Sequence, residues 1–230
     1  MLTRPTRRAV TDWTISWLYD EIFAGRLSGG DALSETELSE RLGVSRSPVR
    51  EALRELERDG VISSDSVNGR RVVAGFEADD IEELYTIRLA LERLSAELAA
   101  SRITHGELEE LRRTIAVMQR VAVTGREGHE EHFDADFAFH EAICRGARTH
   151  RLEALLRPLW RQTRSLLKQI DMAEIYPRGG ELDDARADHS RIVEALARGD
   201  SEAAGKAMAD HLASRRDVLV AAIAKHKSGR

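Results

Sequence analysis

The 230-residue sequence contains one cysteine, four prolines and few aromatic residues, which make up 5% of the chain. The lone cysteine, Cys144, cannot form a disulfide within the chain, which excludes a disulfide-stapled secreted fold. No apolar run approaches the roughly 18 residues of a transmembrane helix. The basic start of the chain is not followed by the apolar segment of a secretory signal. We therefore expect a cytoplasmic protein without membrane contact.

An excess of positive charge is also missing. The formal net charge is −5 at pH 7, and residues 1–76 alone carry 11 arginines and 12 acidic residues. The basic composition that often accompanies nucleic-acid binding is therefore absent. Any argument for DNA binding depends instead on where individual arginines lie on predicted helices.

The abundant residue types, Ala, Leu, Glu and Arg, favour helices, and the length suits two domains. A first helix is expected over 6–24, and the next 50 residues carry mixed helix and strand signals. From Glu77 onward strand signals are missing, and "REG" at 126–128 is expected to separate two helices. Six amphipathic segments lie near 79–101, 104–123, 129–146, 150–175, 181–198 and 200–225. Thr104 and Glu107 form a capping box at the start of the second segment. We predict one domain over 1–76 and an all-helical antiparallel bundle over 77–230.

Residues 33–43 carry the signals of a short, capped helix. Ser34 and Glu37 form an S-x-x-E capping box, and Leu33 and Leu38 occupy the two positions of a hydrophobic staple. Gly43 follows the last apolar position, where a left-handed residue ends many helices. The sequence thus predicts a helix over about 35–42 that ends at a tight glycine turn.

A second helix is predicted directly after this turn. Ser45 and Ser47 are both candidate N-caps, and Pro48 suits the first turn because its missing N–H needs no partner there. The apolar residues that follow keep the i, i+3, i+4, i+7 period, while Arg46 and Arg50 fall on another face. Helix, turn and helix in this order are typical of a helix-turn-helix.

A hairpin is predicted after Gly60, because short β-type runs at 61–62 and 72–73 flank an Asn-Gly turn at 68–69. This hairpin would form a wing that carries Arg70 and Arg71. In a winged helix-turn-helix the second helix enters the major groove, where arginine binds guanine with two hydrogen bonds. Arg46 and Arg50 are therefore the expected base-reading residues; the alternative is that they only pair with neighbouring glutamates.

Three histidines and one aspartate form a candidate metal site in the second domain. Asp136 and His140 are four residues apart, so both point from one helix face. His189 and His211 each lie on a separate predicted helix among apolar neighbours. This donor set suits a divalent transition metal such as Zn²⁺, Ni²⁺ or Mn²⁺. The residues alone are a weak signal, and they favour histidines that are hydrogen-bonded or exposed and bind no metal. His132, one turn before Asp136, is expected to be solvated.

The stretch LSETELSERLGVSRSPVREALRELERDGVI, at 33–62, resembles the signature of GntR-type regulators. The all-helical remainder is similar to the FadR subfamily with its FCD ligand-binding domain. The resemblance implies a homodimeric repressor that binds a palindromic operator in double-stranded DNA. It implies DNA contacts from Thr36, Ser45, Arg46, Ser47, Arg50 and Gly69. Thr36 departs from the arginine that some relatives carry at this position.

The same resemblance bears on the helical domain. Many FCD domains carry an Asp-x-x-x-His pair and two later histidines, which supports the four candidate ligands, with zinc the first expectation. It also implies that Arg88 faces a small carboxylate effector, which a guanidinium can clamp in a bidentate fork. The alternative is a surface ion pair between Arg88 and Glu92, one turn apart.

We expect a regulator that responds to a ligand and is not an enzyme. A metalloenzyme is the second hypothesis, because an open metal position can activate water. No H-E-x-x-H motif or nucleophile motif accompanies the candidate ligands. A third hypothesis is a sensor of the metal itself.

Overall fold

The computed structural model describes residues 7–23, 26–64, 70–74, 78–120, 125–167 and 180–228. They form two compact units that separate between Phe76 and Glu77. Helix α7 (His150–Leu167) is continuous but belongs to both units: its residues up to Trp160 group with the second unit, and those from Arg161 onward group with the first. Within these ranges no helix is long and apolar enough to cross a membrane.

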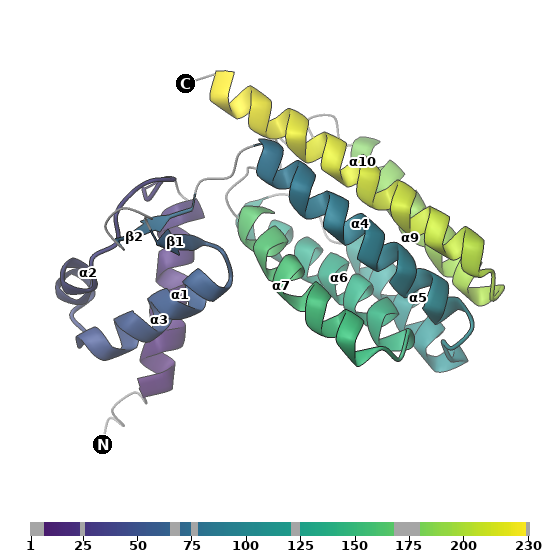
Figure 1. Ribbon diagram of the computed structural model, residues 1–230, viewed down its shortest axis with the longest axis horizontal. Coiled ribbons are helices and arrows are strands. Elements are labelled where there is room, and N and C mark those ends of the chain that lie inside the picture. Colours follow the sequence, from purple (N-terminus) through teal and green to yellow (C-terminus); the bar gives the residue numbers. More distant parts are fainter. Residues whose placement is uncertain are drawn as a thin grey trace. The chain divides into compact units, whose positions relative to one another are not determined.

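The first unit is a winged helix-turn-helix, as predicted (Figure 1). Its elements are α1 (Arg7–Phe23), α2 (Glu35–Leu42), α3 (Arg46–Arg58), β1 (Ile62–Ser64) and β2 (Arg71–Val73). The two strands are antiparallel, with Ile62 opposite Val73 and Ser64 opposite Arg71. A single further bridge joins Ala32 to Val72, so the segment before α2 also attaches to the hairpin. The Asn-Gly turn lies outside the described residues.

The predicted helix caps of this unit are present. Ser34 adopts an extended conformation, and its hydroxyl accepts a hydrogen bond from the backbone N–H of Glu37. Gly43 ends α2 with φ 64°, the left-handed region that glycine tolerates best. Ser45 precedes α3 in an extended conformation without a side-chain cap bond, whereas Ser47 lies within the helix. The fully buried core residues include Leu18, Val49, Leu53, Leu56 and Val61.

The second unit is the predicted all-helical bundle. It contains α4 (Ala78–Ala100), α5 (His105–Arg120), α6 (Gly125–Gly146), most of α7, α9 (Gly180–Ala197) and α10 (Ser201–Ser228). The long helices α10 and α4 lie side by side (Figure 1), and α10 also packs on α9 while α5 packs on α6. This packing brings residues that are far apart in sequence into one interior.

Two helix boundaries of the bundle are informative. Helix α6 begins at Gly125, so the break expected at 126–128 is wrong. A single glycine costs a helix only about 1 kcal/mol relative to alanine, so it does not end a helix by itself. The capping box at the start of α5 is confirmed, because Glu107 Oε2 accepts from the Thr104 N–H at 2.9 Å. Arg148 Nη1 and Nη2 also bind Glu107, at 2.7 and 2.9 Å.

Candidate metal centre and DNA-binding surface

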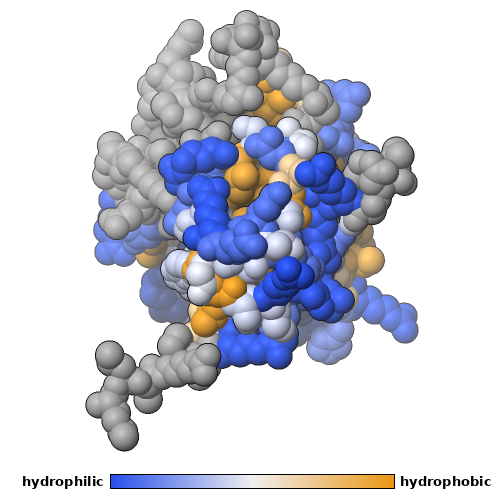
Figure 2. Space-filling view, turned by 90° about the vertical axis from the view of Figure 1, so that its left-hand side faces the viewer, coloured by the Kyte–Doolittle hydropathy of each residue, from blue (hydrophilic) through white to orange (hydrophobic). Residues whose placement is uncertain are grey.

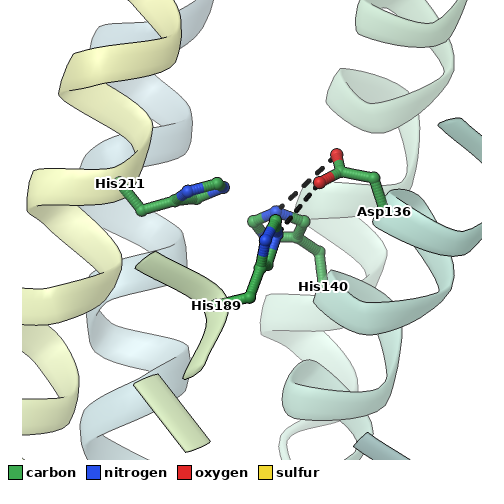
Figure 3. A group of neighbouring side chains, drawn as sticks. All are labelled: Asp136, His140, His189 and His211. Atoms are coloured by element: carbon green, nitrogen blue, oxygen red, sulfur yellow. Dashed lines mark ion pairs between the residues drawn. The ribbon is translucent and has the colours of Figure 1, made fainter. Parts of the chain in front are cut away.

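Asp136, His140, His189 and His211 meet in the interior of the bundle (Figure 3). The first two come from α6, and the others come from α9 and α10, so three helices contribute. One donor atom of each residue lies within 4.8 Å of the donor atoms of the other three. The three histidines are at most 3% exposed. The bundle therefore places all the sequence-predicted candidate ligands together.

The close pairs in this cluster involve the aspartate. His189 Nε2 lies 3.0 Å from Asp136 Oδ1, and His140 Nε2 lies 4.0 Å from Asp136 Oδ2. Burial acts to raise the pKa of Asp136, but the three neighbouring imidazoles lower it well below its ordinary value. Burial and the neighbouring His189 lower the pKa of His211 to about 4. Near neutral pH, Asp136 is thus ionised and His211 neutral, the forms that bind a metal.

The donor set fits a divalent transition metal. Four buried ring nitrogens make no hydrogen bond to any of the residues that the structure describes: Nε2 of His140, Nδ1 of His189 and both nitrogens of His211. Buried polar atoms without a partner are rare and costly, so they favour an additional ligand at this place. Zinc binds imidazole nitrogen and carboxylate oxygen at about 2.0–2.2 Å, so one ion can contact donors that surround it closely. Three nitrogens and one oxygen do not select among Zn²⁺, Ni²⁺ and Mn²⁺.

Arg88 lies inside the bundle, not on its surface. Its Nε donates to Glu92 Oε1 at 2.7 Å, and both side chains are only 2% exposed. The Arg88 guanidinium also lies 4.8 Å above the centre of the Tyr85 ring. The alternative considered from sequence, an Arg88–Glu92 pair, is therefore present, but its position on the surface is wrong.

Other polar residues around the cluster were missed by sequence reasoning. His140 Nδ1 lies 2.5 Å from Glu92 Oε2, and His211 Nδ1 lies 3.8 Å from Asp188 Oδ2. Asp188 directly precedes His189 in sequence. This adjacency does not indicate that Asp188 on α9 faces His211 on α10. Arg215 follows His211 by one turn of α10, so helical spacing alone would have placed it on the same face.

Two neighbours of this site on α6, His132 and Cys144, are buried. His132 is buried at 5% exposure, so the prediction of a solvated side chain is wrong. Its ring contacts Phe133 edge-on, with centroids 6.0 Å apart; the acidic residues beside it in sequence did not reveal which face of α6 packs inward. Cys144 is buried, as expected for a small apolar side chain, and burial raises the pKa of its thiol to about 11.

The predicted DNA-binding residues lie at the start of α3 and around it. Ser45, Arg46 and Arg50 are exposed, whereas Thr36 and Ser47 are half-buried. Ser47 accepts a hydrogen bond from Arg7 Nη2 at 2.6 Å. Arg46 has no ion pair within the described part of the chain. Gly69 lies outside the described residues. Figure 2 shows a largely hydrophilic surface on the side of the first unit.

Arg50 is held by a glutamate of the preceding helix. Arg50 Nε donates to Glu35 Oε2 at 2.9 Å, and Arg71 Nη1 donates to Glu35 Oε1 at 3.0 Å. Arg71 Nε also donates to Glu57 at 3.2 Å. The burial of Glu35 acts to raise its pKa, but hydrogen bonds from both arginines keep it below the ordinary value. One carboxylate thus connects α2, α3 and the wing.

Comparison with protein-family models gives two matches. Residues 83–214 match the FCD domain. Residues 16–72 match the model described as bacterial regulatory proteins, gntR family. The first match covers the whole candidate metal centre, and the second covers α2, α3, β1 and all but the last residue of β2.

Similar proteins are transcription regulators. The chain is 34% identical over 92% of its length to "Probable D-xylose utilization operon transcriptional repressor" of Paenarthrobacter nicotinovorans, of which 89% is covered. It is 27% identical over 75% of its length to "Gluconate operon transcriptional repressor" of Bacillus licheniformis, of which 67% is covered. A crystal structure of a GntR regulator from Rhodococcus sp. RHA1 superposes with a TM-score of 0.66 at 28% identity, covering 91% of this chain and 96% of that one.

Proposed function

Because the chain belongs to the GntR family of bacterial transcription regulators, in the group that carries an FCD domain, we propose that it is a homodimeric repressor controlled by a small organic acid. The acid would bind at a metal ion held in the helical bundle. The observation that carries this proposal is the buried cluster of one carboxylate and three imidazoles within the residues that match the FCD domain. Relatives with this domain organisation are regulators and not enzymes.

DNA recognition is assigned to the start of α3. Arg46 and Arg50 would enter the major groove and bind base edges, while the serines and the N–H groups of the first turn would bind phosphates. Thr36 and Gly69 would add contacts from α2 and the wing. The exposed positions of Arg46 and Arg50 support this assignment. The net negative charge of the chain means that these local contacts, and not an overall basic field, must provide the affinity.

A homodimer would bind two half-sites of a palindromic operator. Support for self-association comes from α4, where Ile87 and Leu94 are 41% and 43% exposed. They lie seven residues apart, hence on the same helix face. Large apolar side chains that share one exposed helix face favour burial against a partner, and we propose that a second copy of this chain covers them.

The metal would be held by Asp136, His140, His189 and His211. When bound, the ion supplies a Lewis-acid position at which a carboxylate oxygen can replace water. Arg88 would bind the same carboxylate, because a guanidinium matches its planar geometry. The effector class is therefore a small organic acid, and the name of the gluconate operon repressor among the relatives is consistent with this class.

The acid can change operator binding only if it binds one arrangement of the dimer more tightly than another. We propose fluorescence anisotropy of a genomic fragment that the protein binds, with metal-loaded and chelator-treated protein, each with and without a panel of organic acids. An acid that changes the affinity of the metal-loaded protein alone supports the proposal. A change caused equally by the chelator in the absence of acid would identify a metal sensor, and no response to any acid would contradict effector control.

A further inference from the structure

Glu92 lies at a junction of three helices beside the candidate metal centre. Its Oε1 accepts hydrogen bonds from Arg88 Nε at 2.7 Å and from Trp160 Nε1 at 3.0 Å. Its Oε2 lies 2.5 Å from His140 Nδ1. These neighbours come from α4, α7 and α6, so one carboxylate joins a metal-ligand candidate to the proposed effector residue.

The environment holds this carboxylate in place. Glu92 is buried, and the Arg88 guanidinium and the Trp160 N–H both bind its Oε1. A buried carboxylate without partners would be strongly unfavourable, and Arg88 supplies the compensating charge. Because Arg88 and Trp160 both bind Oε1, the side chain is held with Oε2 toward His140.

The position of Oε2 determines which imidazole nitrogen faces the candidate metal. A neutral imidazole has one N–H and one lone pair, and the hydrogen bond of one nitrogen sets the role of the other. The carboxylate oxygen Oε2 lies 2.5 Å from Nδ1, so its negative charge favours a proton on this nitrogen over a lone pair. The lone pair is then on Nε2, the nitrogen that lies 4.0 Å from Asp136 Oδ2. Metal-binding histidines commonly donate their second nitrogen to a carboxylate, which orients the ring and raises its basicity.

We infer that Glu92 is the positioning residue of the metal centre: it fixes the tautomer and ring orientation of His140 and ties this ligand to Arg88. This inference rests on the proposed metal site. Asp188 faces His211 in a similar way, but at 3.8 Å it is more distant, and it also pairs with Arg191 at 2.9 Å. Glu92 is therefore the stronger of the two contacts.

Because Glu92 contacts both Arg88 and His140, we expect it to connect effector binding with metal binding. An acid that binds Arg88 competes with Glu92 for the same guanidinium. A resulting shift of the Glu92 side chain would change the orientation of the His140 ring. Metal affinity and acid affinity should therefore be coupled, each altering the other by the same factor.

The test is the affinity of the full-length protein for Zn²⁺, measured by competition with a chromophoric chelator. We expect E92Q to weaken binding tenfold or more, the usual effect of removing such an orienting group. The matched control is E97Q, because Glu97 lies on the same helix and forms an i,i+4 pair with Arg93 at 2.8 Å, outside the metal cluster. E97Q should bind Zn²⁺ like the wild type.

A double-mutant cycle separates positioning from general damage to the fold. In an H140A background, E92Q should add no more than about a twofold loss, because the histidine that it orients is gone. If E92Q folds poorly, the double variant R88Q/E92Q, which removes both charges of the buried pair, should show the same tenfold loss. Unchanged Zn²⁺ affinity of E92Q, or a loss that persists in H140A, would overturn the inference. A wild-type protein that binds no metal would overturn the proposed function as well, so the two failures are distinguishable.

Discussion

Arg50 Nε and Glu35 Oε2 lie 2.9 Å apart, so an arginine of the proposed recognition helix is anchored to the helix before it. Arg50 is half exposed in this position and points from the same end of α3 as Arg46. An anchored arginine has fewer conformations to lose when it binds a base, which favours selective recognition.

The substitution Arg50→Ala is expected to weaken specific operator binding by about 1–3 kcal/mol, the range for loss of a bidentate arginine–guanine contact. Anisotropy titrations with the operator and with random DNA measure the change. Arg58→Ala is the matched control, because Arg58 is an exposed arginine in the last turn of the same helix. If both DNAs lost affinity equally with Arg50→Ala, the residue would contact phosphate and not a base.

The substitution Glu35→Gln removes a negative charge from the DNA-facing unit and loosens both Arg50 and Arg71. We expect tighter binding to random DNA, because electrostatic attraction to phosphates increases, together with a smaller ratio of specific to non-specific affinity. Glu40→Gln, an exposed acidic residue of the same helix, controls for the loss of charge alone. An equal change in the two variants would mean that Glu35 does not position the arginines.

The substitution His189→Ala is expected to reduce metal content well below that of the wild type. Its ring lies 3.0 Å from Asp136 and 4.4 Å, between centroids, from His211, so its loss leaves three of the four candidate donors. Operator binding in the absence of acid should stay the same. Elemental analysis measures the metal, with His105→Ala, an exposed histidine of α5, as the control. Full metal content in His189→Ala would remove His189 from the ligand set.

Acid should destabilise the second unit partly through the cap of α5. The hydrogen bonds from Arg148 and Thr104 lower the pKa of Glu107 from 4.5 to about 2. Because the folded-state pKa is the lower one, the stabilisation is complete above pH 4.5 and is lost as pH falls toward 2. The side chain is 27% exposed, so solvent screening reduces its contribution to about 1–2 kcal/mol.

Chemical denaturation at pH 7 and at pH 3 measures this contribution. Glu107→Gln should lower the free energy of unfolding at pH 7 and make it less dependent on pH below 4.5. Glu109→Gln is the control, because Glu109 forms an exposed pair with Arg112 on the same helix. The same pH profile for wild type and Glu107→Gln would exclude the cap as the cause.

Local signals predicted most of the architecture. The N-cap at Ser34, the capping box at Thr104 and the turn at Gly43 depend on residues within one helical turn of each other, and the structure contains all three. Regular apolar spacing similarly located most helices of the bundle to within a few residues, whereas the end of the segment predicted over 150–175 lies outside the described residues, which end α7 at Leu167. These features require no knowledge of which helices pack together.

Features that depend on packing between distant segments were harder to predict. Periodicity does not show that Arg88 and Glu92 lie inside the bundle, nor that His132 faces inward. The contact from Glu92 to His140 joins residues 48 positions apart, and no spacing rule connects them. The candidate ligands were recognised because a resemblance to FCD domains singled them out, whereas the residues that orient them became visible only in three dimensions.

The most direct test of the account is the effect of organic acids on operator affinity in metal-loaded wild-type protein and in a His189→Ala/His211→Ala variant. We predict that at least one small carboxylate changes the dissociation constant of the wild type about tenfold or more, within the usual range of allosteric coupling, and leaves the variant unchanged. An equal response of both proteins, or no response of the wild type to any acid, would contradict the proposed metal-centred control of DNA binding.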